Sequence, residues 1–165
     1  MIHDIDLSKY NKICVIGGPG VGKTYFTARL ARELGRPIIS LDEIRFAARR
    51  HHGASLTPDQ CAKQLGTEMG KHKKYIVEGT AYQPWTEPAI ANADIVVVLY
   101  QPAIVRCGRI FRRWVVDNKY HRSFWDTVRL MRISRVWYRK RYPLIQERIV
   151  SNGRAFVMIQ PRRNK

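Results

Sequence analysis

The chain has 165 residues, and its 30 Lys and Arg against 13 Asp and Glu give a formal net charge of +17. This length predicts one domain, residues 1–165, with a substantial buried core. No apolar run is long enough to cross a bilayer, and the first residues lack the order of a signal peptide, so membrane and secreted classes are not expected.

The three cysteines, Cys14, Cys61 and Cys107, are isolated along the sequence and lack metal-ligand spacing. An odd number of separated cysteines indicates free thiols in a reducing compartment. We therefore expect a cytoplasmic protein, with Cys14 as a small core residue of the first strand.

The first predicted strand, residues 12–17, leads directly into a glycine-rich loop. The loop sequence, Gly17-Gly18-Pro19-Gly20-Val21-Gly22-Lys23-Thr24, fits the phosphate-loop pattern G-x-x-x-x-G-K-[ST] at every fixed position. Apolar residues then recur at helical spacing over 23–35, where Gly35 supplies a stop. Strand, glycine loop and helix is the arrangement that the motif requires, so we expect nucleoside triphosphate binding.

Each part of this loop has a physical role. Glycine tolerates positive φ and close approach, so backbone N–H groups can surround a polyphosphate beside the positive end of the helix dipole. Lys23 is expected to reach the β- and γ-phosphates and Thr24 to bind Mg²⁺. ATP and Mg²⁺ are the expected cofactors, and the predicted nucleotide-binding residues are Gly17, Gly18, Pro19, Gly20, Val21, Gly22, Lys23, Thr24 and Tyr25.

Strands and helices continue to alternate along the chain. The pattern predicts strands over 37–41, 74–78 and 94–100, and helices over 42–51, 58–72 and 84–92, with Thr57 and Pro58 opening the helix at 58. Such alternation indicates an α/β fold with a parallel sheet covered on both faces. Ligands of these sheets bind outside the carboxyl ends of the strands.

Carboxylates follow two of these strands. Asp42 comes after the second strand and Glu78 after the third. Phosphoryl transfer needs carboxylates near Mg²⁺ and a group that orients or deprotonates the acceptor hydroxyl. We predict Lys23, Asp42 and Glu78 as catalytic residues, with Thr24 and Glu78 at the metal, while Asp42 could instead be a helix N-cap.

Arginines follow the fourth strand, on a helix predicted over 103–116. Arg106, Arg109 and Arg113 recur at helical spacing beside Arg112. Arginines from a mobile segment stabilise the charge of a transferring phosphoryl group, although such a row can also form a solvated helix face. One or two functional arginines are expected, with Arg109 and Arg113 preferred as catalytic residues.

The C-terminal part carries nearly all of the charge excess. Residues 101–165 contain 17 Lys and Arg and only 3 Asp and Glu. A helix predicted from residue 123 meets Pro143, which should kink or restart it, and a strand is predicted over 155–159. We expect Trp125 and Trp137 in the core. Arg129, Arg132, Arg135 and Arg139 form a basic stripe on this helix, which we expect to attract nucleic acid or anions in general.

In these residues the chain resembles small P-loop proteins related to adenylate kinase, of the DNA topology modulation type. The likeness is carried by Gly17–Thr24, by Ile39-Ser40-Leu41-Asp42, by Tyr75-Ile76-Val77-Glu78-Gly79-Thr80, by Arg106–Arg113 and by Arg132–Ile149. It implies a three-layer P-loop NTPase sandwich with a five-stranded parallel sheet of order 2-3-1-4-5. It also implies an acceptor-binding segment near 43–72, a lid near 106–122 and a C-terminal helix, here basic, near 123–149.

The sequence departs from that family in two ways. Glu78 and Thr80 stand where the family usually has Asp and Asn, and the Asp-Gly-x-Pro-Arg motif of adenylate kinases is absent. AMP is therefore not the expected acceptor. Basic residues of the acceptor segment nevertheless favour an anionic acceptor, and they are Arg45, Arg49, Arg50, His51 and His52.

Two functions follow from these patterns. The first is a kinase-like phosphotransferase that moves the γ-phosphate of ATP to a small, anionic, nucleotide-like acceptor. The alternative is a nucleotide-switched ATPase that binds nucleic acid through its basic C-terminal half, or a kinase of polynucleotide ends.

Overall fold

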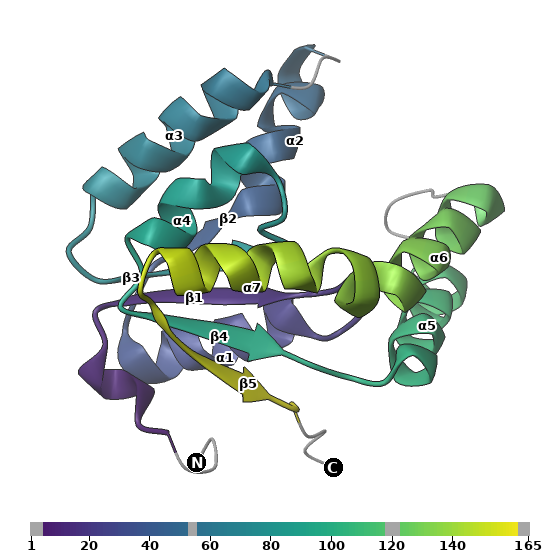
Figure 1. Ribbon diagram of the computed structural model, residues 1–165. Helices are drawn as coiled ribbons and strands as arrows, with labels where there is room; N and C mark the ends of the chain where they lie inside the picture. The colour runs from purple at the N-terminus through teal and green to yellow at the C-terminus, as the bar shows by residue number, and fades with distance from the viewer. Residues whose placement is uncertain (1–4, 53–55, 118–122, 162–165) are drawn as a thin grey trace.

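A five-stranded sheet forms the centre of the computed structural model, which describes residues 5–52, 56–117 and 123–161 (Figure 1). All neighbouring strands are parallel, and the order is β2-β3-β1-β4-β5. The strands are β1 (Lys12–Gly17), β2 (Ile38–Ser40), β3 (Tyr75–Gly79), β4 (Ile95–Leu99) and β5 (Ala155–Ile159). The predicted strand order and α/β class are confirmed.

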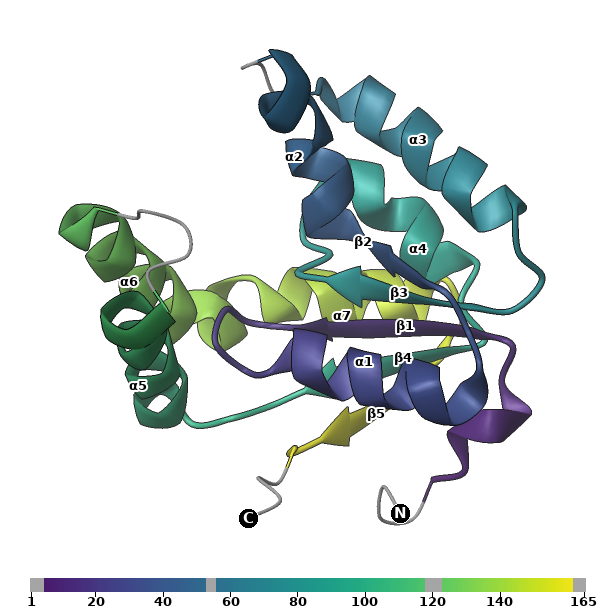
Figure 2. The ribbon, with the colours of Figure 1, turned by 180° about the vertical axis from the view of Figure 1, so that it is seen from behind.

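Helices cover both faces of this sheet (Figures 1 and 2). The α-helices are α1 (Lys23–Leu34), α2 (Leu41–His52), α3 (Pro58–Gly70), α4 (Glu87–Ala91), α5 (Ala103–Arg112), α6 (Phe124–Lys140) and α7 (Tyr142–Ser151). Short turns of other helix types are η1 (Leu7–Lys9), η2 (Pro84–Thr86) and the π-helix η3 (Arg113–Asp117). Helices α5 and α6 stand beyond the end of the sheet toward which the strands point (Figure 1).

Two apolar clusters hold the layers together. On one face, Phe26 and Leu30 of α1 pack against side chains of β1, β3 and β4. On the other face, residues of α2, α3, α4, α6 and α7 pack together, with Trp137 and Ile149 fully buried. Strands β1, β3 and β4 are nearly continuous apolar runs because both of their faces are covered, whereas β5 at the edge of the sheet leaves Phe156 and Met158 exposed.

The helix boundaries follow the local signals in the sequence. Gly35 adopts a left-handed conformation with φ 62° and ends α1, while Thr57 and Gln60 form a capping box at the start of α3. Pro143 lies in the first turn of α7, so the long C-terminal helix restarts there, where the missing proline amide costs no helix bond. The predicted helix 103–116 instead changes to a π-helix at Arg113.

The prediction that both tryptophans belong to the core is half wrong. Trp137 is fully buried, but 75% of the Trp125 side chain is exposed. Both are tryptophans of the same helix, and it is the position of the partner elements that separates them. Cys14 is buried in β1 as expected, and all three cysteines are free thiols.

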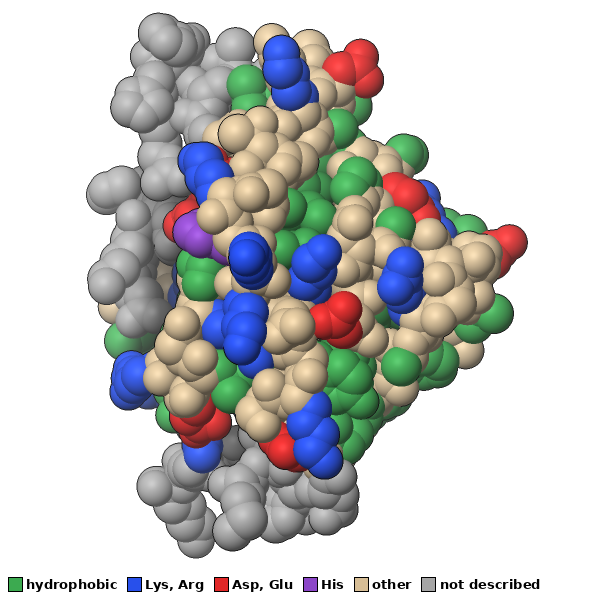
Figure 3. Space-filling view, turned by 90° about the vertical axis from the view of Figure 1, so that its left-hand side faces the viewer, with side chains coloured by type: hydrophobic (Ala, Val, Ile, Leu, Met, Phe, Trp, Pro, Cys, Tyr) green, Lys and Arg blue, Asp and Glu red, His purple; other side chains and the backbone are tan. Residues whose placement is uncertain are grey.

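Charges of both signs occur on one side of the molecule. On the side of the molecule that contains α3, Lys and Arg are interspersed with Asp and Glu (Figure 3). No helix within the described ranges combines the length and apolar character that a bilayer crossing requires.

Candidate active site

The phosphate loop lies between β1 and α1, at the carboxyl end of the central strand (Figure 2). Gly20 and Gly22 adopt φ values of 77° and 101°, a region that L side chains rarely occupy. Gly22 is the N-cap of α1 and offers no side-chain oxygen to the first amides of that helix. An anion bound to the loop would satisfy these amides, as at other helix N-termini.

Lys23 reaches back over this loop. Its Nζ donates hydrogen bonds to the carbonyl oxygens of Gly17 at 3.0 Å and Gly18 at 3.3 Å. Burial lowers the pKa of Lys23, while the charges of Asp42 and Glu78 oppose that shift. The residue is half-buried, and a bound phosphate would supply further negative charge to its ammonium group. Thr24 and Tyr25, the next two residues of α1, are exposed.

Glu78 is the buried carboxylate of the site. It lies on β3 opposite Val15 of β1 and Ser40 of β2, and the Ser40 hydroxyl donates to its Oε1 at 3.3 Å. Its Oε2 is buried without a hydrogen-bond partner. Burial raises the pKa of Glu78, Lys23 lowers it and Asp42 raises it further. An unpartnered carboxylate oxygen at this position is suited to a cation or a donor from a ligand.

Asp42 is exposed and lies in the first turn of α2. The prediction of an N-cap at Asp42 is wrong, because α2 begins one residue earlier and Ser40 takes that role. The Ser40 Oγ accepts a hydrogen bond from the amide of Glu43 at 3.3 Å. Gly79 allows the close approach of α2, since a Cβ there would lie 2.7 Å from the Cβ of Leu41. Asp42 and Glu78 are thereby brought to the same edge of the sheet.

The arginines of α5 divide into two kinds. Arg106 is almost fully buried, and it donates to the carbonyl of Gln101 at 2.9 Å and to Ser134 on α6. Arg109 donates from Nη1 to the carbonyl of Val21 in the phosphate loop at 2.8 Å. Arg113 begins η3, one helical turn further along, and is exposed. Of the two preferred arginines, the structure places Arg109 against the loop.

Side chains of α6 form hydrogen bonds with the backbone of the phosphate loop, a role that sequence reasoning missed. Ser134 donates to the carbonyl of Pro19 at 2.9 Å, and the amide of Gly18 donates to the Tyr138 hydroxyl at 3.4 Å. The Tyr138 hydroxyl in turn donates to the carbonyl of Leu99 at the end of β4. Burial raises the pKa of Tyr138 to about 12, with a smaller opposing effect from Arg106. The apolar spacing of α6 indicated core residues but gave no sign of their polar contacts with the loop.

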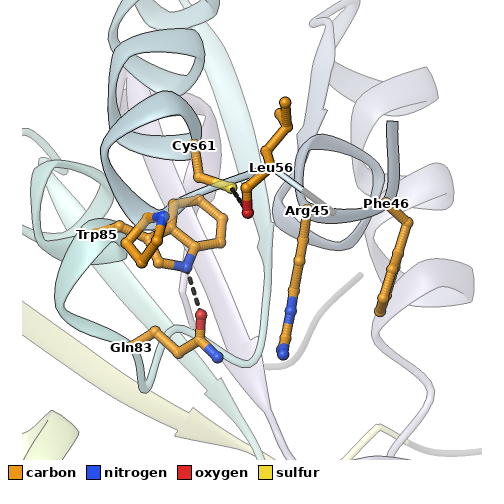
Figure 4. Close-up of a pocket in the computed structure, with 7 residues that line it drawn as sticks. Arg45, Phe46, Leu56, Cys61, Gln83 and Trp85 are labelled. Atoms are coloured by element: carbon orange, nitrogen blue, oxygen red, sulfur yellow. Dashed lines mark hydrogen bonds between the residues drawn. The ribbon is translucent and has the colours of Figure 1, made fainter. Parts of the chain in front are cut away.

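A pocket of about 220 Å³ opens beside this edge, between α2, α3 and the chain that follows β3 (Figure 4). Arg45 and Gln83 point into it from opposite sides (Figure 4). The remaining lining residues are Phe46, Leu56, Pro58, Cys61 and Trp85. Apolar walls with a few polar groups are typical of small-molecule sites.

The polar groups of this pocket are held by neighbours. The Trp85 indole donates to Gln83 Oε1, and Gln83 Nε2 lies 3.3 Å from the Tyr82 hydroxyl. The Arg141 guanidinium lies 3.9 Å from the centre of the Tyr82 ring. Burial raises the pKa of Tyr82, but hydrogen bonds from Gln83 and Arg45 outweigh it and the pKa is lowered. Arg45 is the one charged side chain among the described lining residues, which favours an anionic ligand.

One strained residue turns the chain toward the pocket. Ala81 has φ 46°, the only positive value at a residue other than glycine in the described ranges. It separates the Glu78 edge from Tyr82 and Gln83, and no feature of the sequence predicted it. The other basic residues proposed for the acceptor segment, Arg49, Arg50, His51 and His52, have side chains outside the described part of the chain.

Two solved structures with a similar fold are kinases. A shikimate kinase from Acinetobacter baumannii in complex with shikimate matches with a TM-score of 0.60 and 20% identity, over 95% of this chain and 87% of that one. A gluconokinase from Sinorhizobium meliloti 1021 matches with a TM-score of 0.53 and 17% identity, over 92% and 84%. No family model and no curated protein matches the sequence. The chain therefore has the fold of small P-loop kinases.

Proposed function

We propose that this chain is an ATP-dependent phosphotransferase that moves the γ-phosphate to a small, anionic acceptor of the nucleotide or hydroxy-acid class. The observation that carries the proposal is the juxtaposition of a phosphate loop with two carboxylates, Asp42 and Glu78, whose charges act on Lys23. The fold shared with two small kinases supports it.

The nucleotide and its cation fit the residues present. Left-handed glycines shape a loop for an anion, and the amides at the start of α1 have no side-chain cap. Thr24 offers an exposed hydroxyl, and Glu78 an unpartnered buried oxygen. When bound, ATP and Mg²⁺ supply the phosphoryl group and a cation that neutralises its oxygens. We assign Thr24 and Glu78 to the metal and residues 17–25 to the nucleotide.

Side chains of this protein bind the phosphate oxygens and stabilise the charge that develops on them. Lys23 leaves the loop carbonyls and binds phosphate oxygens, and Arg109, already against the loop, stabilises charge that develops during transfer. Arg113 approaches from the next turn of the same segment. We assign the described part of the expected lid, residues 106–117, to this role, with Arg106 bonded to Gln101 and Ser134 at its start. Residues 118–122 of that segment lie outside the described ranges.

We assign Asp42 a role in acting on the acceptor. It precedes Arg45 by three residues on α2, and positions so spaced share one side of a helix. Arg45 lines the pocket, and the charge of Asp42 acts on the pKa of Lys23. We assign Asp42 to orient the acceptor hydroxyl and accept its proton, and Arg45 to bind the negative charge of the acceptor.

Transfer of label from ATP to a panel of acceptors tests this function. The panel contains nucleosides, nucleoside monophosphates, oligonucleotide 5′ ends, shikimate and gluconate, with ATP binding measured in parallel. Lys23→Met should abolish transfer, whereas Lys63→Met on the exposed side of α3 should leave it unchanged. ATP binding without label on any acceptor, or full transfer by Lys23→Met, would contradict the proposal.

A further inference from the structure

An exposed tryptophan stands at the start of α6. Three quarters of the Trp125 side chain is exposed, and the adjoining Phe124 is half exposed. A chain of ring contacts fixes their position: Phe111 to Trp114 at 5.8 Å, Trp114 to Phe124 at 5.6 Å, and Phe124 to Trp125 at 5.6 Å between centroids. Trp125 is thus held at the end of an aromatic row that joins α5 to α6.

Two arginines share the helix face of this tryptophan. Trp125, Arg132 and Arg139 follow one another at intervals of seven residues, which is close to two helical turns. All three are exposed, and they form a line about 20 Å long at 1.5 Å per residue. Arg129 and Arg135, also exposed, flank this line.

The opposite face of α6 is buried against the phosphate loop. Ser134 and Trp137 are fully buried there, and Ser134 bonds to Pro19. The outer residues are therefore not needed to pack the helix, and their chemistry requires another explanation. Asp126 is the one acidic residue of the helix, and it lies about 100° around the helix axis from Trp125.

We propose that this outer face of α6 binds single-stranded nucleic acid, with a base stacked on Trp125 and backbone phosphates on Arg132 and Arg139. Aromatic rings stack on unpaired bases irrespective of sequence, and a positively charged track follows the backbone. The 17 Lys and Arg of residues 101–165, against 3 Asp and Glu, supply complementary charge.

The geometry favours a single strand over two other polyanions. A duplex keeps its bases stacked and would leave Trp125 without a ring to contact. A membrane surface is a plane, and it would contact the side chain of Trp125 at one depth. Arg132 and Arg139 instead extend along the helix axis away from Trp125. A linear chain of phosphates with free bases matches both features.

Fluorescence anisotropy of a short labelled oligothymidylate, without ATP or acceptor, tests the proposal independently of phosphotransfer. Trp125→Ala should weaken binding about ten-fold, and Trp125→Phe should restore most of it, because stacking needs a ring. Arg132→Gln with Arg139→Gln should weaken binding and reduce the salt slope by about 1.4, at about 0.7 for each lost single-strand phosphate contact.

The matched control is Lys73→Gln with Lys74→Gln, which removes two exposed charges just before β3. This pair should change affinity far less than the α6 pair. Equal losses from both pairs, tighter binding of a duplex of the same length, or unchanged binding by Trp125→Ala would overturn the proposal. Binding to phosphatidylserine vesicles that depends on Trp125, with no binding of the oligonucleotide, would assign this face to a membrane surface instead. Circular dichroism of each variant confirms that the fold is retained.

Discussion

The two faces of α6 use similar residues for opposite purposes. The inner face places the fully buried Trp137 and Ser134 and the half-buried Tyr138 against the phosphate loop. The outer face exposes Trp125, Arg132 and Arg139. Burial couples the inner residues to the fold and to the nucleotide site, whereas exposure leaves the outer residues available to a partner. Helix composition alone does not distinguish these roles.

The largest expected effect is on the inner face. Trp137→Ala should lower the free energy of unfolding by about 3–5 kcal/mol, because it removes a fully buried ring and leaves a cavity beside Gly18. Urea denaturation measures it. Trp125→Ala is the matched control on the outer face and should change that free energy by less than about 0.5 kcal/mol. Equal effects of the two substitutions would contradict the comparison.

A smaller effect is expected from Tyr138→Phe, which keeps the ring and removes the hydroxyl. The amide of Gly18 and the carbonyl of Leu99 would each lose a partner, so stability should fall by about 1–3 kcal/mol. ATP affinity should fall as well, since Gly18 belongs to the phosphate loop. Calorimetry of unfolding and of ATP binding measures both effects. Tyr142→Phe, at another partly buried tyrosine, serves as the control.

A pH effect should follow from Glu78. Burial raises its pKa above the ordinary value of 4.5, so the native state holds this proton more tightly than the unfolded state does. This contribution to stability is fully present below pH 4.5 and is lost as pH rises through the raised pKa. Glu78→Gln has no carboxyl group to deprotonate, so it should not lose this stability as pH rises. The melting temperature of the variant should therefore fall less than that of the wild type between pH 4.5 and neutral pH. A parallel pH dependence in both proteins would show that Glu78 is not the group responsible.

The smallest expected effect is that of Arg132→Gln with Arg139→Gln on stability. Both side chains are exposed, so the free energy of unfolding should change by less than about 0.5 kcal/mol. The same variant is expected to lose oligonucleotide affinity. Unchanged stability together with weaker binding would separate the outer face of α6 from its inner face. A large loss of stability would show that the arginines belong to the fold after all.

Local signals predicted much of this protein. The loop from Gly17 to Thr24, the stop at Gly35, the cap at Thr57 and the restart at Pro143 each depend on the conformational limits of one or a few residues. Short, largely apolar runs predicted the five strands. The order of the sheet came instead from the family resemblance, and the structure confirmed it.

The site was only partly predictable. Asp42 and Glu78 lie at one edge because parallel strands end there, which the sequence pattern anticipated. The cap at Ser40, the close approach at Gly79 and the left-handed Ala81 were not anticipated, because each depends on where a neighbouring element lies.

The amino-acid sequence by itself determined the phosphate loop, the alternation of strands and helices, and the concentration of positive charge after residue 100. These features follow from short-range backbone preferences and from residue counts. Only the tertiary structure decided that Trp137 is buried and Trp125 exposed, and that Arg106 anchors α5 while Arg109 contacts the loop. Burial is a property of the surrounding elements, and residues distant in the chain supply them.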